Sequence, residues 1–477
     1  MIWTFFAHAG AQPCDTMSRL FDAPLPPDEI IVVTEEEKIL RDAFSTNTSG
    51  VYSENFTLKW GSDYGGTPYS DVILSAFETL WEVQILEWGH ALPYGSETHL
   101  FNIYIGNTGP EVPNIPDGVA GYYTRDFEGW PMIVLHPNTF GAQPSDVFAL
   151  LAHEFYHAVQ DAEQSYTTPI SRWVWEPTAN WAASQFVPDS PFNVNGLDSY
   201  MKLSEKSLRF FTPVQDFTPE EYYTYGSAMF PIHIHERLGE PGVIQEIWKR
   251  ASEDSDAVEV LSEILEEYGY SFEEVWMDHN EGLIELNYEY GDIYQQAVTS
   301  QWYTETWSEE GVGIHEADVE QSLEHLGFHV HKLTEPQKPI LRIQVWGDPI
   351  GTESSLGTFY ARVVHKTFND TSTYVFDMER NFDELRLDMN ESDEVYLVVG
   401  VESQLLRSSF DSGETFTYSF SMEGLDLPPE YVPVEEDTGI DLDVDIWELV
   451  CGCNHADPMS MSAGLWVLAL YWRRRRY

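Results

Sequence analysis

Two histidines and a glutamate stand at a spacing that can serve one metal ion. Residues 153–157 read His-Glu-Phe-Tyr-His. On a helix, residues four apart lie about 40° apart around the axis and roughly 6 Å along it, so both imidazoles can reach the same ion. The carboxylate of Glu154 can reach a water bound to that ion and take its proton. One helical turn therefore offers two ligands, His153 and His157, and a general base.

The flanking sequence predicts a helix over residues 145–163. Pro144 precedes this segment, Ser145 or Asp146 can cap it, and no proline or glycine interrupts it. Its apolar residues recur at helical spacing, so the two histidines and the glutamate fall in a strongly apolar stretch. Polar side chains there are costly without partners. The alternative is a surface helix with two solvated histidines.

A third ligand is expected at Glu176, which eighteen residues separate from His157. A catalytic zinc site uses three protein ligands and leaves a fourth position to water. Because Pro177 is tolerated only in the first turn of a helix, Glu176 should lie at a helix start and point back at the metal. Asn180, one turn later, could accept the free N–H of a ligating histidine. Otherwise Glu176 is an ordinary glutamate favoured by the helix dipole.

This pattern resembles the gluzincin zinc peptidases, in which a glutamate on a second helix completes the site. The resemblance is closer to a group of metalloproteases common in myxobacteria and covers roughly residues 55–290. It implies a zinc endopeptidase acting on a protein or peptide substrate, with Zn²⁺ held by His153, His157 and Glu176. Its marks are the segments 77–83 (FETLWEV), 150–160 (LLAHEFYHAVQ), 173–181 (WVWEPTANW), 225–231 (YGSAMFP) and 247–248 (IW).

The resemblance also implies a mechanism. Glu154 takes the proton of a zinc-bound water and later passes it to the leaving amine. Tyr225 matches the position expected for a donor to the oxyanion, and Tyr222, Tyr223 and His233 are alternatives. Many gluzincins carry an aspartate in place of Asn180; the amide can accept the same hydrogen bond but adds no charge.

The surrounding elements predict an α+β zincin-like peptidase domain over residues 55–300. A helix over about residues 70–88 and three strands precede the metal helix, and helices follow it. We expect the substrate to add as a strand to a sheet edge near the metal helix, formed by residues 101–105 or 131–135. The expected strands are 56–60, 101–105 and 131–135, and the expected later helices are 226–238, 243–251 and 258–268.

From residue 318 to residue 424 the hydrophobic period changes to two, which predicts an all-β sandwich domain of about 100 residues. His329 and His331 share a face of one strand there, and without further ligands we interpret them as structural. The expected strands are 327–333, 341–346, 358–364, 374–378, 394–399 and 415–422.

Composition narrows the classes of partner. The net charge is −56, from 80 acidic and 24 basic residues, and such a surface repels nucleic acid, so we exclude DNA and RNA partners. Acidic clusters could bind Ca²⁺ as a second metal, although no EF-hand loop is present. The three cysteines lie at positions 14, 451 and 453, so no disulfide framework holds the body of the chain.

The two ends resemble sorting segments. Residues 1–25 read as a signal-like leader, with a buried N-terminal strand as the alternative, and residues 26–54 read as an N-terminal arm or pro-segment. Residues 425–449 read as an acidic linker. Residues 450–477 combine a Gly-Cys motif, a short apolar run and four arginines, which resembles the myxobacterial C-terminal sorting tag. That resemblance implies export, transient membrane contact and anchoring at the cell surface; a tail-anchoring segment is the alternative.

Two other functions stay open at this point. One is a non-catalytic surface adhesin or binding protein that retains a zincin scaffold. The other is a different zinc hydrolase, acting on an ester or amide at the same site.

Overall fold

The computed structural model places unit 1–426 and a second unit, 427–477, and every residue that it describes belongs to the first. The predicted sorting tag and nearly all of the predicted linker therefore lie outside the described residues, as do the three cysteines and most of the predicted leader and arm. The described residues are 16–20, 23–25, 38, 40–41, 48–213, 216, 218–239, 242–298, 301–307, 313–316, 322–334, 338–347, 357–378, 382–390, 392–403 and 415–426.

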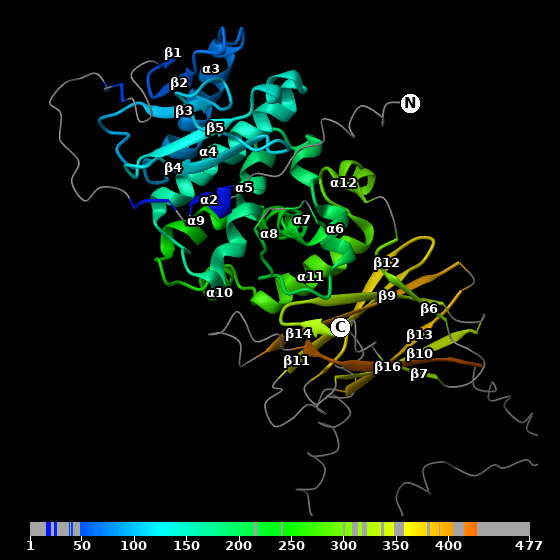
Figure 1. The fold of residues 1–477 in the computed structure, drawn as a ribbon. Helices are drawn as coiled ribbons and strands as arrows, with labels where there is room; N and C mark the ends of the chain where they lie inside the picture. Colours follow the sequence, from blue (N-terminus) through cyan, green and yellow to red (C-terminus); the bar gives the residue numbers. More distant parts are fainter. Residues whose placement is uncertain are drawn as a thin grey trace, which may run out of the picture. The chain divides into compact units, whose positions relative to one another are not determined.

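A five-stranded mixed sheet opens the fold, with strand order β1-β2-β3-β5-β4 (Figure 1). Strands β2 (Phe56–Trp60), β3 (Phe101–Ile105) and β5 (Pro131–Leu135) are mutually parallel and have the predicted bounds. The edge strands β1 (Ser49–Tyr52) and β4 (Gly121–Arg125) pair antiparallel with their neighbours. The prediction that β3 or β5 forms the sheet edge was wrong. Both are interior strands, because β4 pairs with the outer side of β5 and so forms the edge itself.

The predicted metal helix is α4, Pro144–Glu163, which packs against β4 and β5. Pro144 occupies its first turn, and the N-cap is Gln143, which makes no side-chain cap. The expected cap by Ser145 or Asp146 is therefore not the one used; the fixed φ of the proline starts the helix one residue earlier. Every residue from Ala149 to Gln160 is buried, so the alternative of a surface helix with solvated histidines is excluded.

An aromatic cluster anchors α4 to the sheet. The ring of Phe155 lies 5.4 Å from that of Phe56 and 6.0 Å from that of Phe101, centroid to centroid. On the helical side it lies 6.2 Å from both Phe77 and Trp81. These last two belong to α3 (Ser70–Leu80) and to the π-helix η1 (Trp81–Glu87), which together replace the single helix predicted over residues 70–88.

Helices follow the sheet, as predicted. The helix expected over 226–238 is α8, which begins three residues later; Gly226 instead ends the preceding helix, α7, where an added Cβ would lie 2.2 Å from the Gly196 carbonyl oxygen. α6, α7, α11 and α12 were not predicted. The elements are η3 (Pro169–Val174), α5 (Trp175–Ser184), η4 (Pro191–Val194), α6 (Leu197–Lys202), α7 (Pro219–Gly226), α8 (Met229–Leu238), α9 (Gly242–Arg250), α10 (Ala257–Glu267), α11 (Phe272–Glu285) and α12 (Gly291–Ala297).

Two further sheets, β13-β10-β16-β7 and β12-β11-β14-β9-β6, enclose a second apolar core. The chain is thus a mixed α/β protein with several sheets. β6 and β7 join these sheets, so the β region begins upstream of the expected residue 318. The strands are β6 (Thr304–Trp307), β7 (Gly313–Glu316), β8 (Leu323–Glu324), β9 (Phe328–Thr334), β10 (Ile340–Gly347), β11 (Gly357–Lys366), β12 (Thr371–Val375), β13 (Phe382–Asp388), β14 (Glu394–Ser403), β15 (Thr415–Phe416) and β16 (Tyr418–Leu425).

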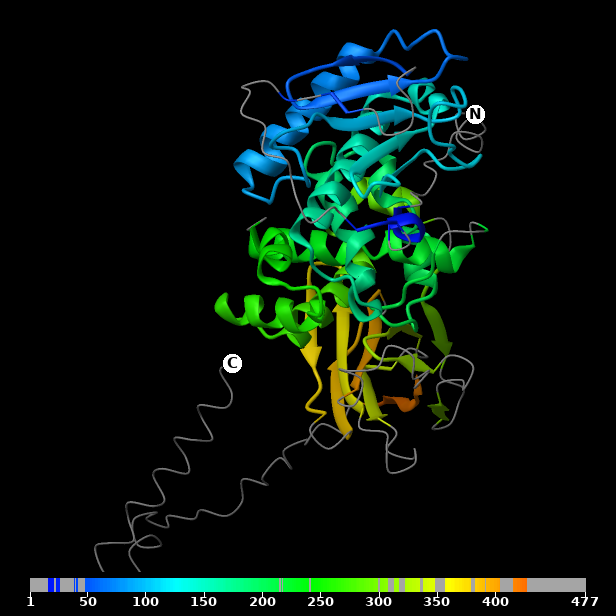
Figure 2. The same cartoon turned by 60° about the vertical axis from the view of Figure 1, so that its left-hand side comes forward.

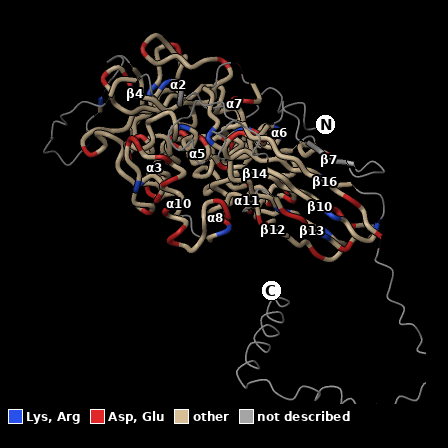
Figure 3. The backbone as a smooth tube through the Cα atoms, turned by 90° about the horizontal axis from the view of Figure 1, so that it is seen from below, with Lys and Arg blue, Asp and Glu red and all other residues tan. Residues whose placement is uncertain are grey.

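A short N-terminal helix, α2 (Thr16–Leu20), lies beside β4 although many residues separate them in sequence; both views show it in dark blue (Figures 1 and 2). Acidic residues are spread along the described chain and outnumber the basic ones (Figure 3). No helix within the described ranges has the length and apolarity needed to span a bilayer.

We predict that Phe155→Ala lowers the free energy of unfolding by about 3–5 kcal/mol, because it removes a fully buried ring from the cluster that anchors α4. Urea unfolding followed by tryptophan fluorescence measures the change. Phe368→Ala is the matched control, since this ring is 90% exposed and its loss should change stability by no more than about 0.5 kcal/mol. Equal stabilities of the two variants would contradict the packing described above.

Candidate metal centre

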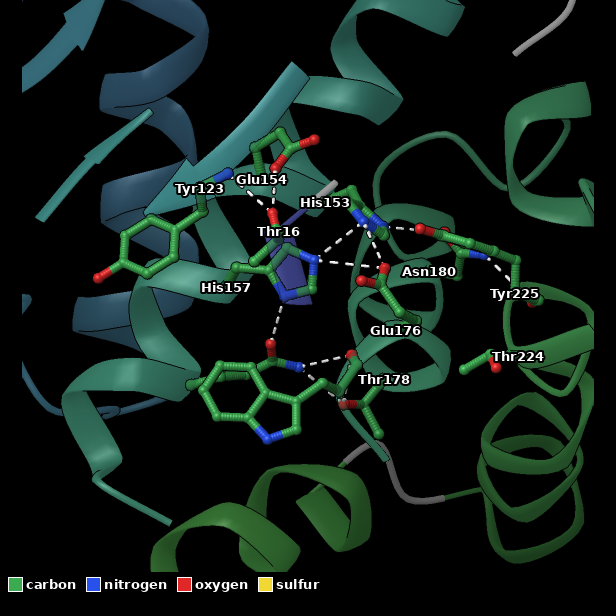
Figure 4. Close-up of polar contacts among 12 residues, drawn as sticks. Thr16, Tyr123, His153, Glu154, His157, Glu176, Thr178, Asn180, Thr224 and Tyr225 are labelled. Carbon is green, nitrogen blue, oxygen red and sulfur yellow. Dashed lines mark hydrogen bonds and ion pairs between the residues drawn. The ribbon is translucent and has the colours of Figure 1, made fainter. Parts of the chain in front are cut away.

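The three expected ligand residues meet in the interior. His153 and His157 project from α4, and Glu176 projects from the first turn of α5 (Figure 4). The two Nε2 atoms lie 3.0 Å apart, and the Oε2 atom of Glu176 lies 3.2 Å from the first and 3.4 Å from the second. All three residues are buried, and together they could hold a metal ion.

A glutamine fixes the orientation of His157. The Nδ1 atom of this histidine lies 2.6 Å from Oε1 of Gln160. The nitrogen of the same amide donates to the carbonyl of Trp175 and to the hydroxyl of Thr178, both at 2.9 Å. Because both donors are used there, the amide oxygen faces the imidazole, and Nδ1 must carry the proton. The remaining nitrogen, Nε2, is left with a lone pair directed at the centre of the cluster.

An asparagine plays the same part for His153. Its Nδ1 atom lies 2.9 Å from Oδ1 of Asn180, and the nitrogen of that amide donates to the backbone carbonyl of Tyr225 at 3.2 Å (Figure 4). The hydrogen bond expected of Asn180 is therefore present. It again places the imidazole proton on Nδ1 and leaves Nε2 as an electron-pair donor.

The electrostatics of the cluster demand a positive charge. When both imidazoles are neutral, their two Nε2 lone pairs face the Oε2 atom of Glu176 at 3.2 and 3.4 Å. A proton on one of the histidines can supply this positive charge in place of a metal ion. Burial lowers the pKa of His157, but the Glu176 carboxylate outweighs burial and the pKa is raised overall. Burial likewise opposes ionisation of Glu176, yet the two histidines hold its pKa at about 2.

The carboxylate of Glu154 contacts β4 and α2, and it lies close enough to the cluster to contribute to the raised pKa of His157. A Cβ atom added to Gly121 would lie 3.2 Å from Oε1 of Glu154, so the glycine lets the strand come this close. The Oε2 atom accepts a hydrogen bond from the hydroxyl of Thr16 at 3.2 Å. The expected general base is therefore enclosed between the strand and the N-terminal helix.

The candidate residues for donating to the oxyanion lie in different places relative to the metal-ligand cluster. The ring of Tyr225 stacks beside His153, with 6.4 Å between centroids and 27° between planes. Tyr223, in contrast, donates its hydroxyl to two backbone carbonyls at 206 and 207, and Tyr222 is only half-buried on the same helix. His233 packs against α11, where burial lowers its pKa to about 4. Tyr225 is thus the candidate that adjoins a ligand.

Three contributors to this centre were not foreseen. Gln160 follows His157 by three residues on the same helix, a spacing at which side chains meet, so a closer reading of α4 could have found it. Thr178 lies on α5 and orients the glutamine through the contact given above. Thr16 lies 138 residues from Glu154, and nothing in the sequence links them. The expected structural role of His329 and His331 agrees with their shared contact to the Tyr418 hydroxyl.

We predict that Gln160→Leu weakens zinc binding about 10–100-fold, because His157 loses the partner that fixes its tautomer. Competition against a chromophoric chelator at fixed pH measures the affinity. Gln185→Leu is the matched control: that side chain bonds only within the end of α5, and its loss should leave the affinity unchanged. An unaltered affinity in Gln160→Leu would show that the glutamine does not orient a ligand.

Metal binding should release a proton in weakly acidic solution. A proton and a metal ion compete for Nε2 of His157, and the raised pKa means that the metal-free protein keeps this proton to a higher pH than an ordinary histidine does. Affinity should therefore fall about tenfold per pH unit as the pH drops below the pKa of His157. Calorimetry in two buffers of different ionisation heat should show that the number of protons released per zinc rises as the pH falls from neutral into weakly acidic solution; an equal release at every pH would contradict the raised pKa of His157.

Comparison with known proteins places the chain in a family. No curated protein matches it. One solved structure found as similar is "A novel family GH115 4-O-Methyl-alpha-glucuronidase, BtGH115A, with specificity for decorated arabinogalactans", at 9% identity and a TM-score of 0.15, over 59% of this chain and 39% of that one. A likeness this weak carries no argument about fold or activity. Residues 41–400, most of the chain, match a single family model, and the protein belongs to that family of unknown function, DUF6055.

Proposed function

We propose that the cluster binds zinc and that the protein is a zinc-dependent endopeptidase of the gluzincin type. The observation that carries the proposal is the size of the ligand triangle. Atoms bound at about 2.0–2.1 Å around a tetrahedral zinc ion lie about 3.3 Å from one another. The three facing atoms of His153, His157 and Glu176 are separated by 3.0, 3.2 and 3.4 Å. The triangle therefore suits zinc with little rearrangement.

The donor set supports the same choice of metal. Two imidazole nitrogens and one carboxylate oxygen suit zinc, whereas calcium takes six to eight oxygen ligands. The two orienting amides, Gln160 and Asn180, give each imidazole the tautomer that binding needs. Calcium elsewhere on the acidic surface stays a prediction.

In the proposed catalytic step, Glu154 is the residue that accepts and then donates a proton. Zinc, when bound, lowers the pKa of a water molecule and polarises the scissile carbonyl. Glu154 follows His153 directly on α4, so its carboxylate is positioned to accept the proton of that water and to donate it to the leaving amine. The ring of Tyr225, stacked beside His153, makes it our choice for the residue that donates to the oxyanion.

The outer edge of β4 favours a peptide as the substrate of this site. Tyr123 pairs with Ile133 of β5, yet its N–H donates to the hydroxyl of Thr16 and so points away from β5. The outer edge of β4 thus carries backbone groups that an extended peptide could pair with, next to Glu154. This favours hydrolysis of a peptide over that of a simple ester. Export and surface anchoring stay predictions, since residues 450–477 lie outside the described part of the chain.

A non-catalytic adhesin on a zincin scaffold is the second candidate, and one observation weighs against it. Binding alone needs no carboxylate beside the metal ligands, and an unused glutamate in the interior is costly. Glu154 is nevertheless retained there with no exposed surface.

We predict that Glu154→Gln still binds one zinc per chain but cleaves peptides about 10²–10⁴-fold more slowly, because it loses the base and keeps the ligands. Zinc content and cleavage of casein or a fluorogenic peptide library are measured on the full chain and on a chain without residues 1–25. Glu176→Gln should instead lose zinc. Zinc well below one equivalent in the wild type, or unchanged cleavage in Glu154→Gln, would refute the proposed function.

A further inference from the structure

The proposed base is closed off from solvent. Glu154, His153 and His157 have no exposed surface, and Glu176 is 2% exposed. A peptide cannot reach a carboxylate in this state, nor can the base receive a water from bulk solvent. Some element that covers Glu154 must leave before any substrate binds, and the contacts of Glu154 identify which one.

The covering element is α2, through its first residue. The hydroxyl of Thr16 donates to Oε2 of Glu154 at 3.2 Å and accepts from the backbone N–H of Tyr123 at 2.8 Å (Figure 4). One oxygen thus occupies two positions at once. It lies where a water would donate its proton to Glu154, and where a carbonyl of a paired peptide would accept from the edge of β4. Thr16 itself is fully buried.

The chain around α2 continues this contact along β4. The guanidinium of Arg19 lies 4.2 Å from the ring centroid of Tyr122, and Arg125 donates to the carbonyl of Pro24 at 3.5 Å. Leu20 is 2% exposed and belongs to the main apolar core. Arg19, Thr16 and Pro24 therefore contact positions 122, 123 and 125 of the strand at which we expect substrate to pair, and the buried side chain of Leu20 anchors α2 there.

We propose that α2, together with Pro24, forms an internal inhibitor, which keeps the metal centre closed until α2 is released. The proposal rests on the proposed function, since it assigns α2 the place of substrate. It departs from the predicted organisation of the N-terminus, because α2 lies within residues 1–25, which were expected to be a leader, and packs on the body of the chain. A cut anywhere between Pro24 and β1, in the segment read from sequence as an arm or pro-segment, would separate the inhibitor from the catalytic body.

Two variants of the full chain test the inhibitor. Thr16→Val keeps the shape of the side chain and removes both hydrogen bonds, and Leu20→Asp removes the apolar anchor. Thr79→Val and Leu86→Asp are matched controls, because Thr79 bonds only to a carbonyl of its own helix and Leu86 is 67% exposed. Each protein is loaded with zinc, and two quantities are measured: the rate at which a chromophoric chelator removes the zinc, and the rate of casein cleavage.

Both variants should release zinc about tenfold faster than the wild type or more, because opening of the site requires α2 to leave. Casein cleavage should rise in the same two variants, and the controls should match the wild type. Zinc release at the wild-type rate in both variants would overturn the inhibitor, as would a wild type that cleaves casein as fast as they do. Faster zinc release without cleavage in any protein would support the closure by α2 and refute the peptidase, so the two failures are distinguishable.

Discussion

The central constraint in this protein is that three buried electron-pair donors lie within 3.4 Å of one another. Each repels the others unless a positive charge lies between them, and burial strengthens that repulsion because a protein interior screens charge less than bulk water does. The fold must therefore bring a cation or a proton to this point. The helix α4 supplies two of the donors because its ligand turn is buried on all sides, and α5 supplies the third because Pro177 confines Glu176 to a first turn.

Neutral amides, not carboxylates, orient both imidazoles. Gln160 and Asn180 fix the tautomers without adding negative charge to a centre that already holds Glu176 and Glu154. The amide of Gln160 is itself fixed by Thr178, whose hydroxyl also accepts from the indole of Trp248 on α9. The orientation of one candidate ligand, His157, thus depends on packing among α4, α5 and α9.

Local sequence patterns correctly predicted the elements that such patterns determine. The bounds of β2, β3 and β5, the metal helix and the placing of Glu176 all follow from periodicity and from the restrictions of proline. Sequence-based prediction failed for features that depend on contacts between segments far apart in the chain. β4 was overlooked, so the sheet edge was assigned to interior strands. The end of α7 at Gly226 packs closely on Gly196, and the role of Thr16 depends on a contact across 138 residues. Local sequence patterns do not predict such long-range contacts.

Zinc K-edge X-ray absorption on the zinc-loaded full chain tests the metal centre most directly. We expect about four nitrogen or oxygen neighbours at about 2.0–2.1 Å, with outer-shell scattering from two imidazoles and no sulfur. His153→Ala should remove the scattering of one imidazole. A shell with sulfur at about 2.3 Å, or one of oxygen atoms alone, would show that zinc binds elsewhere and would contradict a centre built from His153, His157 and Glu176.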